Sequence, residues 1–278
     1  MEPLARALSR ARADGRPSVV PYLMVDRARA PALASTVRAL AENGAAALEL
    51  GFPFSDPIAD GPTLEAAADR ALEHGTRWTD LLGQLRTTSR LLPTAVMTYA
   101  NPVWARGLPA AAKELRAAGA TALIVPDLSL EEAGPWRVAA RRAGLALVLL
   151  AAPSAAPERV ARIARSSDGF LYLVSRYGTT GTGPSSPSGG PLAPLVAAAH
   201  RASPRLPVLI GFGVHDPPSA RAAMASGADG IVVGSALQTE IAQGARPAAL
   251  GLWLGRLVRA VGGTSSRQES NDLRPLRA

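Results

Sequence analysis

Two carboxylates, Glu49 and Asp60, have residue types and positions that suit proton transfer. Glu49 interrupts the apolar run at the start of A-A-L-E-L-G-F-P-F-S-D-P-I-A-D-G-P, residues 46–62. Burial there would raise its pKa, so that it could donate and accept a proton near neutral pH. Asp60, on a proline-rich loop nearer solvent, is expected to stay ionised. The alternative is structural, with Glu49 bonded to a backbone or arginine partner and Asp60 serving as a turn residue.

Two glycine-containing segments could bind a phosphate. G-F-G-V at residues 211–214 closes one predicted strand, and G-S-A at residues 234–236 closes the next and opens a helix. In barrels of eight β/α units, the loops after strands 7 and 8 often bind phosphate with a helix N-terminus. Glycine leaves room for the anion to approach the backbone. Alternatively, these glycines only form tight turns.

Further polar residues follow other predicted strands. Singly, each suits a turn, a cap or the core, but together they predict a pocket with an apolar middle and few polar contacts. These residues are Tyr99, Asn101, Asp127, Tyr172, Ser175 and Arg176.

The residue types that are missing or isolated exclude several kinds of catalysis. The chain has no cysteine, and its one lysine, Lys113, lies in the helical segment A-A-A-K-E-L-R rather than after a strand, which argues against a Schiff base. His74, His200 and His215 are far apart, so we expect neither a metal site nor a cofactor. Proton transfer on a phosphorylated substrate remains.

Composition narrows the class of protein further. The net charge of +8 comes from arginines scattered singly over helices, with only 4% aromatic residues, so nucleic-acid binding is not expected. No apolar run approaches the roughly 20 residues that span a bilayer. No signal peptide is apparent, and no membrane partner is expected. The lack of cysteine fits a cytoplasmic protein.

Short apolar runs alternate with helical stretches along the chain. The predicted strands are Val19–Val25, Ala46–Leu50, Thr94–Thr98, Thr121–Val125, Leu145–Leu150, Gly169–Ser175, Pro207–Ile210 and Gly230–Val233. The predicted helices include Pro31–Glu42, Arg77–Leu91, Leu108–Ala118, Leu130–Ala143, Ala156–Ser166, Leu192–Ala202 and Pro218–Ser226. Ser129, Ser154 and Asp216 are predicted N-caps.

Eight β-then-α units in about 250 residues predict a closed (β/α)₈ TIM barrel of one domain, residues 1–262. An open doubly wound sheet is the rival, but its glycine-rich turn after the first strand is missing. In a barrel, Glu49 and Asp60 both fall at the C-terminal rim, where catalytic groups gather. The stretch Gly178–Gly190 is expected to be a flexible loop acting as a lid, and residues 263–278 a disordered tail.

The sequence closely resembles the α subunit of tryptophan synthase. The stretch L-E-L-G-F-P-F-S-D-P-I-A-D-G-P-T matches that family's most characteristic segment almost letter for letter. Further matches are M-T-Y-A-N-P-V, V-P-D-L, Y-L-V-S-R-Y-G-T-T-G, G-F-G-V and V-V-G-S-A, in the family's order over roughly residues 18–260.

The resemblance implies cofactor-free retro-aldol cleavage of indole-3-glycerol phosphate to indole and glyceraldehyde 3-phosphate. It implies that Glu49 is the general acid and base, that Asp60 holds the indole N–H, and that Tyr172 positions Glu49 or the substrate. By the same resemblance, residues that hold the phosphate, order the lid or line the pocket are Gly181, Gly213, Gly234, Ser235, Thr180, Phe52, Tyr99 and Phe212.

The resemblance also implies a pyridoxal-phosphate β subunit that would contact Pro53, Asp56 and Asn101 in an α₂β₂ assembly. Two segments depart from the family: Y-L-M-V-D-R-A-R-A-P lacks the usual glycine after the first strand, and the Ser/Pro/Gly-rich segment T-G-P-S-S-P-S-G-G replaces a more charged one. Two alternatives therefore stay open: a free-standing lyase that releases indole, and a degenerate protein that only activates a β subunit.

Overall fold

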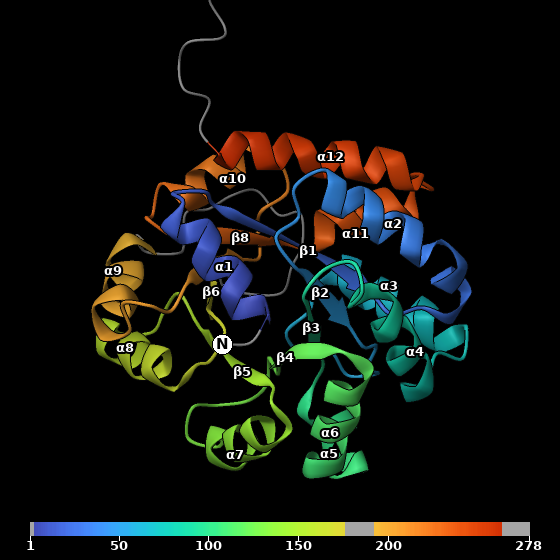
Figure 1. Cartoon of the computed structure of the whole chain (residues 1–278), viewed down its shortest axis with the longest axis horizontal. Coiled ribbons are helices and arrows are strands. Elements are labelled where there is room, and N and C mark those ends of the chain that lie inside the picture. The colour runs from blue at the N-terminus through green and yellow to red at the C-terminus, as the bar shows by residue number, and fades with distance from the viewer. Residues whose placement is uncertain (1–2, 176–191, 263–278) are drawn as a thin grey trace, which may run out of the picture.

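Eight parallel strands form a closed barrel surrounded by helices (Figure 1). The computed structural model describes residues 3–175 and 192–262. Each strand pairs with the next along the chain, and β8 pairs with β1, which confirms the predicted TIM barrel. The strands are β1 (Ser18–Met24), β2 (Leu48–Gly51), β3 (Thr94–Met97), β4 (Ala120–Ile124), β5 (Ala146–Ala151), β6 (Leu171–Val174), β7 (Val208–Gly211) and β8 (Gly230–Val233).

The helices cover the outer face of the barrel. They are α1 (Pro3–Ala13), α2 (Ala30–Glu42), α3 (Pro62–Glu73), α4 (Trp78–Thr88), α5 (Ala100–Arg106), α6 (Leu108–Ala118), α7 (Ala133–Ala143), α8 (Pro157–Ser166), α9 (Leu192–Ala202), α10 (Pro217–Met224), α11 (Ser235–Ala242) and α12 (Pro247–Val261), with a short 3₁₀ helix at Arg27–Arg29. The stretch Gly178–Gly190 and residues 263–278 lie outside the described residues.

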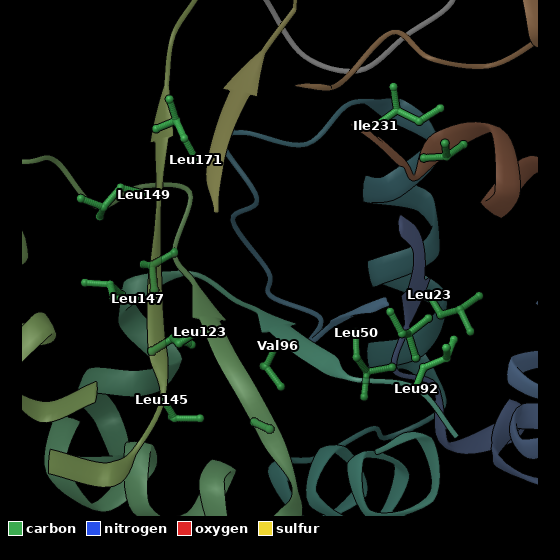
Figure 2. Packing of buried hydrophobic residues seen from close by; sticks show 14 of the residues in the cluster. Leu23, Leu50, Leu92, Val96, Leu123, Leu145, Leu147, Leu149, Leu171 and Ile231 are labelled. Atoms are coloured by element: carbon green, nitrogen blue, oxygen red, sulfur yellow. The ribbon is translucent and has the colours of Figure 1, made fainter. Parts of the chain in front are cut away.

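Alternation along the strands divides the core into two clusters. Outward-facing residues such as Leu23, Leu50 and Leu123 pack under the helices in one cluster (Figure 2). Inward-facing residues such as Tyr22 and Val148 fill the barrel in the other. Successive strand residues therefore face either the barrel interior or the helices, and both sides are mostly apolar. A charged residue within a strand is an exception to this pattern.

The observed N-termini of the helices agree with one of the three predicted N-caps. The Asp216 carboxylate accepts a hydrogen bond from the Ser219 N–H at 2.8 Å, which confirms it as the N-cap of α10. The predicted cap at Ser154 is wrong, because the N-cap of α8 is Ala156, two residues later, and the helix begins at Pro157. Ser129 accepts from Glu132 N–H in the turn before α7 and does not cap the helix itself.

The N-terminal segment forms a helix, α1, that is not among the predicted elements. Leu4 and Leu8 of α1 are buried and belong to the inner cluster, so α1 covers the N-terminal end of the barrel (Figure 1). No helix within residues 3–175 and 192–262 combines the length and apolar character needed to cross a bilayer. The C-terminal end of the barrel is where the predicted chemical groups lie.

Candidate active site

Strand β2 directs Glu49 into the barrel. Leu48 and Leu50, on either side, belong to the outer cluster, so alternation turns Glu49 toward the interior. Its register partner on β1 is Tyr22. The side chain of Glu49 is buried, with the residue 1% exposed, as the interrupted apolar run predicts.

The Glu49 carboxyl has no hydrogen-bond partner on either oxygen among the residues that the structure describes. Burial is the main cause, with Asp60 a second one, of a pKa raised from 4.5 to about 8. The desolvated carboxylate is disfavoured, so the group holds its proton near neutral pH. The structural alternative, in which a backbone or arginine partner satisfies Glu49, is therefore not what the described residues form.

Asp60 lies on the loop that leads into α3. Its N–H donates to the Pro57 carbonyl at 3.0 Å, and Pro62 starts the helix two residues later, so a turn and a helix start hold the side chain in place. Asp60 is itself buried, with the residue 4% exposed, although slightly less so than Glu49 at 1%. Tyr99 and Phe54, with rings 5.4 Å apart, lie at the same end of the barrel.

The electrostatics of Asp60 still differ from those of Glu49. Burial raises the pKa of Asp60 to about 6, a hydrogen bond with Tyr99 lowers it, and Glu65 raises it again. Asp60 therefore ionises about two pH units below Glu49. Near neutral pH the two acids are in different protonation states, a separation that suits one proton donor and one fixed anion.

A small cavity of about 20 Å³ opens beside Glu49. Tyr172 and Phe212, with ring centroids 5.8 Å apart, form part of its wall. Burial, then Glu49, raises the pKa of Tyr172 well above 10, so its hydroxyl is a neutral donor. The lining residues are Tyr22, Glu49, Leu64, Met97, Tyr172, Phe212, Gly213, Val214, Val232, Gly234 and Ser235.

Two glycines make space for the tyrosine hydroxyls. A Cβ at Gly51 would lie 1.9 Å from the Tyr22 hydroxyl, and a Cβ at Gly211 would lie 2.2 Å from that of Tyr172. With any other residue at these two positions, the Tyr22 or Tyr172 side chain would have to move, because Cβ atoms do not approach other atoms so closely. Glycine at the ends of β2 and β7 thus leaves room for the hydroxyl end of each ring over the neighbouring strand.

The predicted phosphate residues Gly213, Gly234 and Ser235 line the same cavity as Glu49. Ser235 begins α11 and lines the cavity, and no side chain caps that helix end, so its first N–H groups lack a side-chain capping oxygen. Gly213 has φ 75°, a conformation that favours glycine, and Phe212 before it also has a positive φ, 67°. Helix N-termini with open N–H groups favour anions.

Other predicted residues lie elsewhere. Phe52 contacts Trp78 edge-on at 5.5 Å in the outer layer and does not line this cavity, and Tyr99 lies beside Asp60. Thr180 and Gly181 lie outside the described residues. Pro53, Asp56 and Asn101 are at the C-terminal rim, where Pro53 is buried and the other two are exposed.

Tyr22, which is not among the predicted site residues, faces Glu49 across the β1–β2 register. Its alternation with Val20 and Met24, all in the inner cluster, was the signal that could have revealed it. Within the described part of the chain, no group of three or more His, Asp or Glu residues is arranged to hold a metal ion. The arrangement can therefore donate a proton, hold an anion nearby and bind a second anion at a helix end.

Comparison with known proteins adds to this geometry. The family model for the tryptophan synthase alpha chain matches residues 8–252. The tryptophan synthase alpha chain of a Synechocystis strain is 37% identical over 246 residues, 88% of this chain and 92% of its own. That of Synechococcus sp. strain CC9902 is 41% identical over 253 residues, 89% of this chain and 93% of its own.

Solved structures agree with the sequence relatives. A structure of Mycobacterium tuberculosis tryptophan synthase superposes with a TM-score of 0.84 at 36% identity, covering 95% of this chain and 99% of that one. Tryptophan synthase subunit alpha from Legionella pneumophila gives 0.79 at 30% identity, covering 94% and 98%. The chain therefore belongs to the tryptophan synthase alpha chain family, the lyases that carry out the retro-aldol cleavage of indole-3-glycerol phosphate.

Proposed function

We propose that Glu49 is both the general acid and the general base of this cleavage. The protonated carboxyl donates to C3 of the indole ring, and the resulting carboxylate accepts the proton of the glycerol hydroxyl next to the bond that breaks. The electron pair of that carbon–carbon bond returns to the ring, releasing indole and the aldehyde. The buried, unpartnered carboxyl in the cavity wall carries this proposal.

Asp60 is proposed to hold the indole N–H as positive charge develops on the ring. Because its pKa is about 6, below that of Glu49, it is the carboxylate at neutral pH. Tyr172, buried beside Glu49 with a neutral hydroxyl, is proposed to position Glu49 or the substrate. Neither acid needs a metal or cofactor for these roles, since proton transfer and charge stabilisation suffice.

Gly213, Gly234 and Ser235 are proposed to bind the substrate phosphate. Their support is the shared cavity with Glu49 and the open N-terminus of α11. Phe212 and Tyr99 are proposed to line the indole side of the site, and Thr180 and Gly181, outside the described residues, keep the roles that the resemblance implies. The Phe52 ring packs against Trp78.

A pyridoxal-phosphate β subunit is the proposed partner. The rim near Asp56 and Asn101 also exposes two large apolar side chains, Ile58 at 76% and Trp104 at 54%. Exposed apolar groups beside an active site are typical of a contact surface. Residues 1–262 are proposed to form one domain, and the cytoplasmic location stays a prediction.

Replacing Glu49 with glutamine tests the central proposal. The Glu49→Gln side chain keeps its size but cannot cycle a proton, so we expect kcat to fall at least about 10²–10⁴-fold. Indole release is the measurement, with circular dichroism to confirm folding. Glu158→Gln, at the start of α8, is the matched control and should keep wild-type turnover. Near-normal turnover of the Glu49 variant would disprove the assignment.

The pH dependence of kcat/KM follows from the two raised pKa values. Activity requires Glu49 protonated and Asp60 ionised, so kcat/KM should fall above about pH 8 and below about pH 6. Because Glu49 and Asp60 interact, the two pKa values seen in the pH profile belong to the pair of carboxyl groups together. A phosphate ester also titrates near 6, so ionisation of the substrate could cause the same fall in kcat/KM at low pH. The Asp60→Asn variant separates these two causes, because any fall at low pH that remains in this variant comes from the substrate. Wild-type activity still rising at pH 9 contradicts the scheme.

Gly234 tests the phosphate site. A Cβ there would be 3.6 Å from the Tyr22 Cβ, an ordinary contact, so Gly234→Ala should bind substrate almost normally. The extra methyl groups of Gly234→Val would enter the cavity and displace the anion. We expect KM for indole-3-glycerol phosphate to rise at least about tenfold with a smaller change in kcat. If KM is the same in both variants, the phosphate binds elsewhere.

Adding a β subunit tests the partner proposal. The chain alone should release indole slowly, and a pyridoxal-phosphate β subunit should raise the rate manyfold. Ile58→Ser should weaken this activation, whereas Leu252→Ser, equally apolar and 61% exposed on α12, should not. Fast release by the chain alone, unchanged by the β subunit, would instead support the free-standing lyase. No release under any condition, with activation of β, would support the degenerate activator.

A further inference from the structure

A second cavity lies outside the barrel wall, next to the end of β1. Its volume of about 90 Å³ exceeds that of the active-site cavity, and a single water needs only about 10–15 Å³. Helices α2, α3, α11 and α12, which lie together on one side of the barrel in Figure 1, form most of its wall. Much of the lining is apolar, from Leu, Ala, Met and Ile side chains.

The polar groups in this wall have an excess of unused donors. Arg70 on α3 is half-buried, Thr36 on α2 is buried, and neither the Arg70 guanidinium nor the Thr36 hydroxyl forms a hydrogen bond or ion pair within the described part of the chain. The Arg29 guanidinium makes only long contacts, 3.7 Å from Nε to Asp26 Oδ2 and 3.5 Å from Nη2 to the Ile241 carbonyl.

The one carboxylate in the wall is already engaged. Asp26 Oδ1 accepts from the Ala28 N–H at 2.8 Å and pairs with His74 Nδ1 at 2.9 Å. The Asp26 carbonyl accepts from Gln84 Nε2 at 2.8 Å. Two arginines therefore face one occupied acid in a pocket whose other lining residues are mostly apolar, with Thr36, Gln84 and Gln238 as the remaining polar ones. A ligand that fits is an anion attached to an apolar body.

The second cavity shares its walls with the active site. On α3, Leu64 lines the active-site cavity and Arg70, nearly two turns later, lines the second. On α11, Ser235 lines the first and Gln238 the second. Gln238 also donates to the carbonyl of Tyr22 at 3.4 Å, and the Tyr22 ring lies in the active site. A ligand that shifts either helix would shift the groups that surround the substrate.

We propose that this second cavity binds a small organic anion with an apolar body, such as a carboxylate on a short hydrocarbon chain, and that its occupancy alters substrate binding through α3 and α11. The binding is independent of the function proposed above. The linkage rests on that function, because it assumes that substrate binds between the N-terminus of α11 and Glu49.

Calorimetric titration of the whole chain with straight-chain carboxylates from butyrate to octanoate, without substrate, tests the binding. We expect saturable binding that is strongest for one chain length, and much weaker binding of the alcohol of that length. Arg70→Met keeps the apolar stem and removes the charge, so affinity should fall about tenfold or more. Thr36→Val should weaken binding less, and Arg86→Met, an exposed arginine on α4 outside both cavities, should not change it.

Steady-state kinetics test the linkage. The best carboxylate should change KM for indole-3-glycerol phosphate in the wild type and in Arg86→Met, and leave KM unchanged in Arg70→Met, whose melting temperature should match the wild type. Saturable binding lost in Arg70→Met but without any change in KM would overturn the linkage alone. Absence of saturable binding, or equal binding by Arg70→Met, would overturn the site, since the carboxylate would then be binding nowhere or in the active site.

Discussion

Desolvation of one carboxyl group is the constraint on which the site depends. Glu49 holds its proton to about pH 8 in the folded chain, whereas an exposed glutamate ionises near 4.5. Between these values the folded state binds a proton that the unfolded chain has released. The free energy of unfolding therefore falls as pH rises through this window, by at most about 1.4 kcal/mol per pH unit for one such group. The rest of the barrel must supply enough stability to keep this acid buried and unpartnered.

The barrel keeps Glu49 buried by packing the aromatic rings of Tyr22 and Tyr172 beside it. Tyr22 and Tyr172 lie over the neighbouring strands because Gly51 and Gly211, at the ends of β2 and β7, have no side chain in their way. The rings exclude water, which raises the pKa of Glu49, yet leave a cavity at its carboxyl. Apolar packing on the inner and outer faces of the strands offsets the free-energy cost of burying the Glu49 carboxyl.

Helices α3 and α11 each serve two places in the molecule. Their N-terminal turns border the active site, and later turns border the larger cavity beside β1. That cavity lies at the segment after β1, where Asp26 and Arg29 form part of its wall, and Glu49 and Asp60 lie outside it.

The sequence by itself determined the barrel, the burial of Glu49 and the convergence of Gly213, Gly234 and Ser235, because alternation along strands and glycine at strand ends are local signals. Only the tertiary structure decided that Asp60 is buried, that Tyr22 faces Glu49, and that the Arg-rich N-terminus covers the base of the barrel as a helix. These depend on contacts between segments far apart in the chain. A local pattern tells which side of a strand or helix a residue takes, but not which distant element covers it.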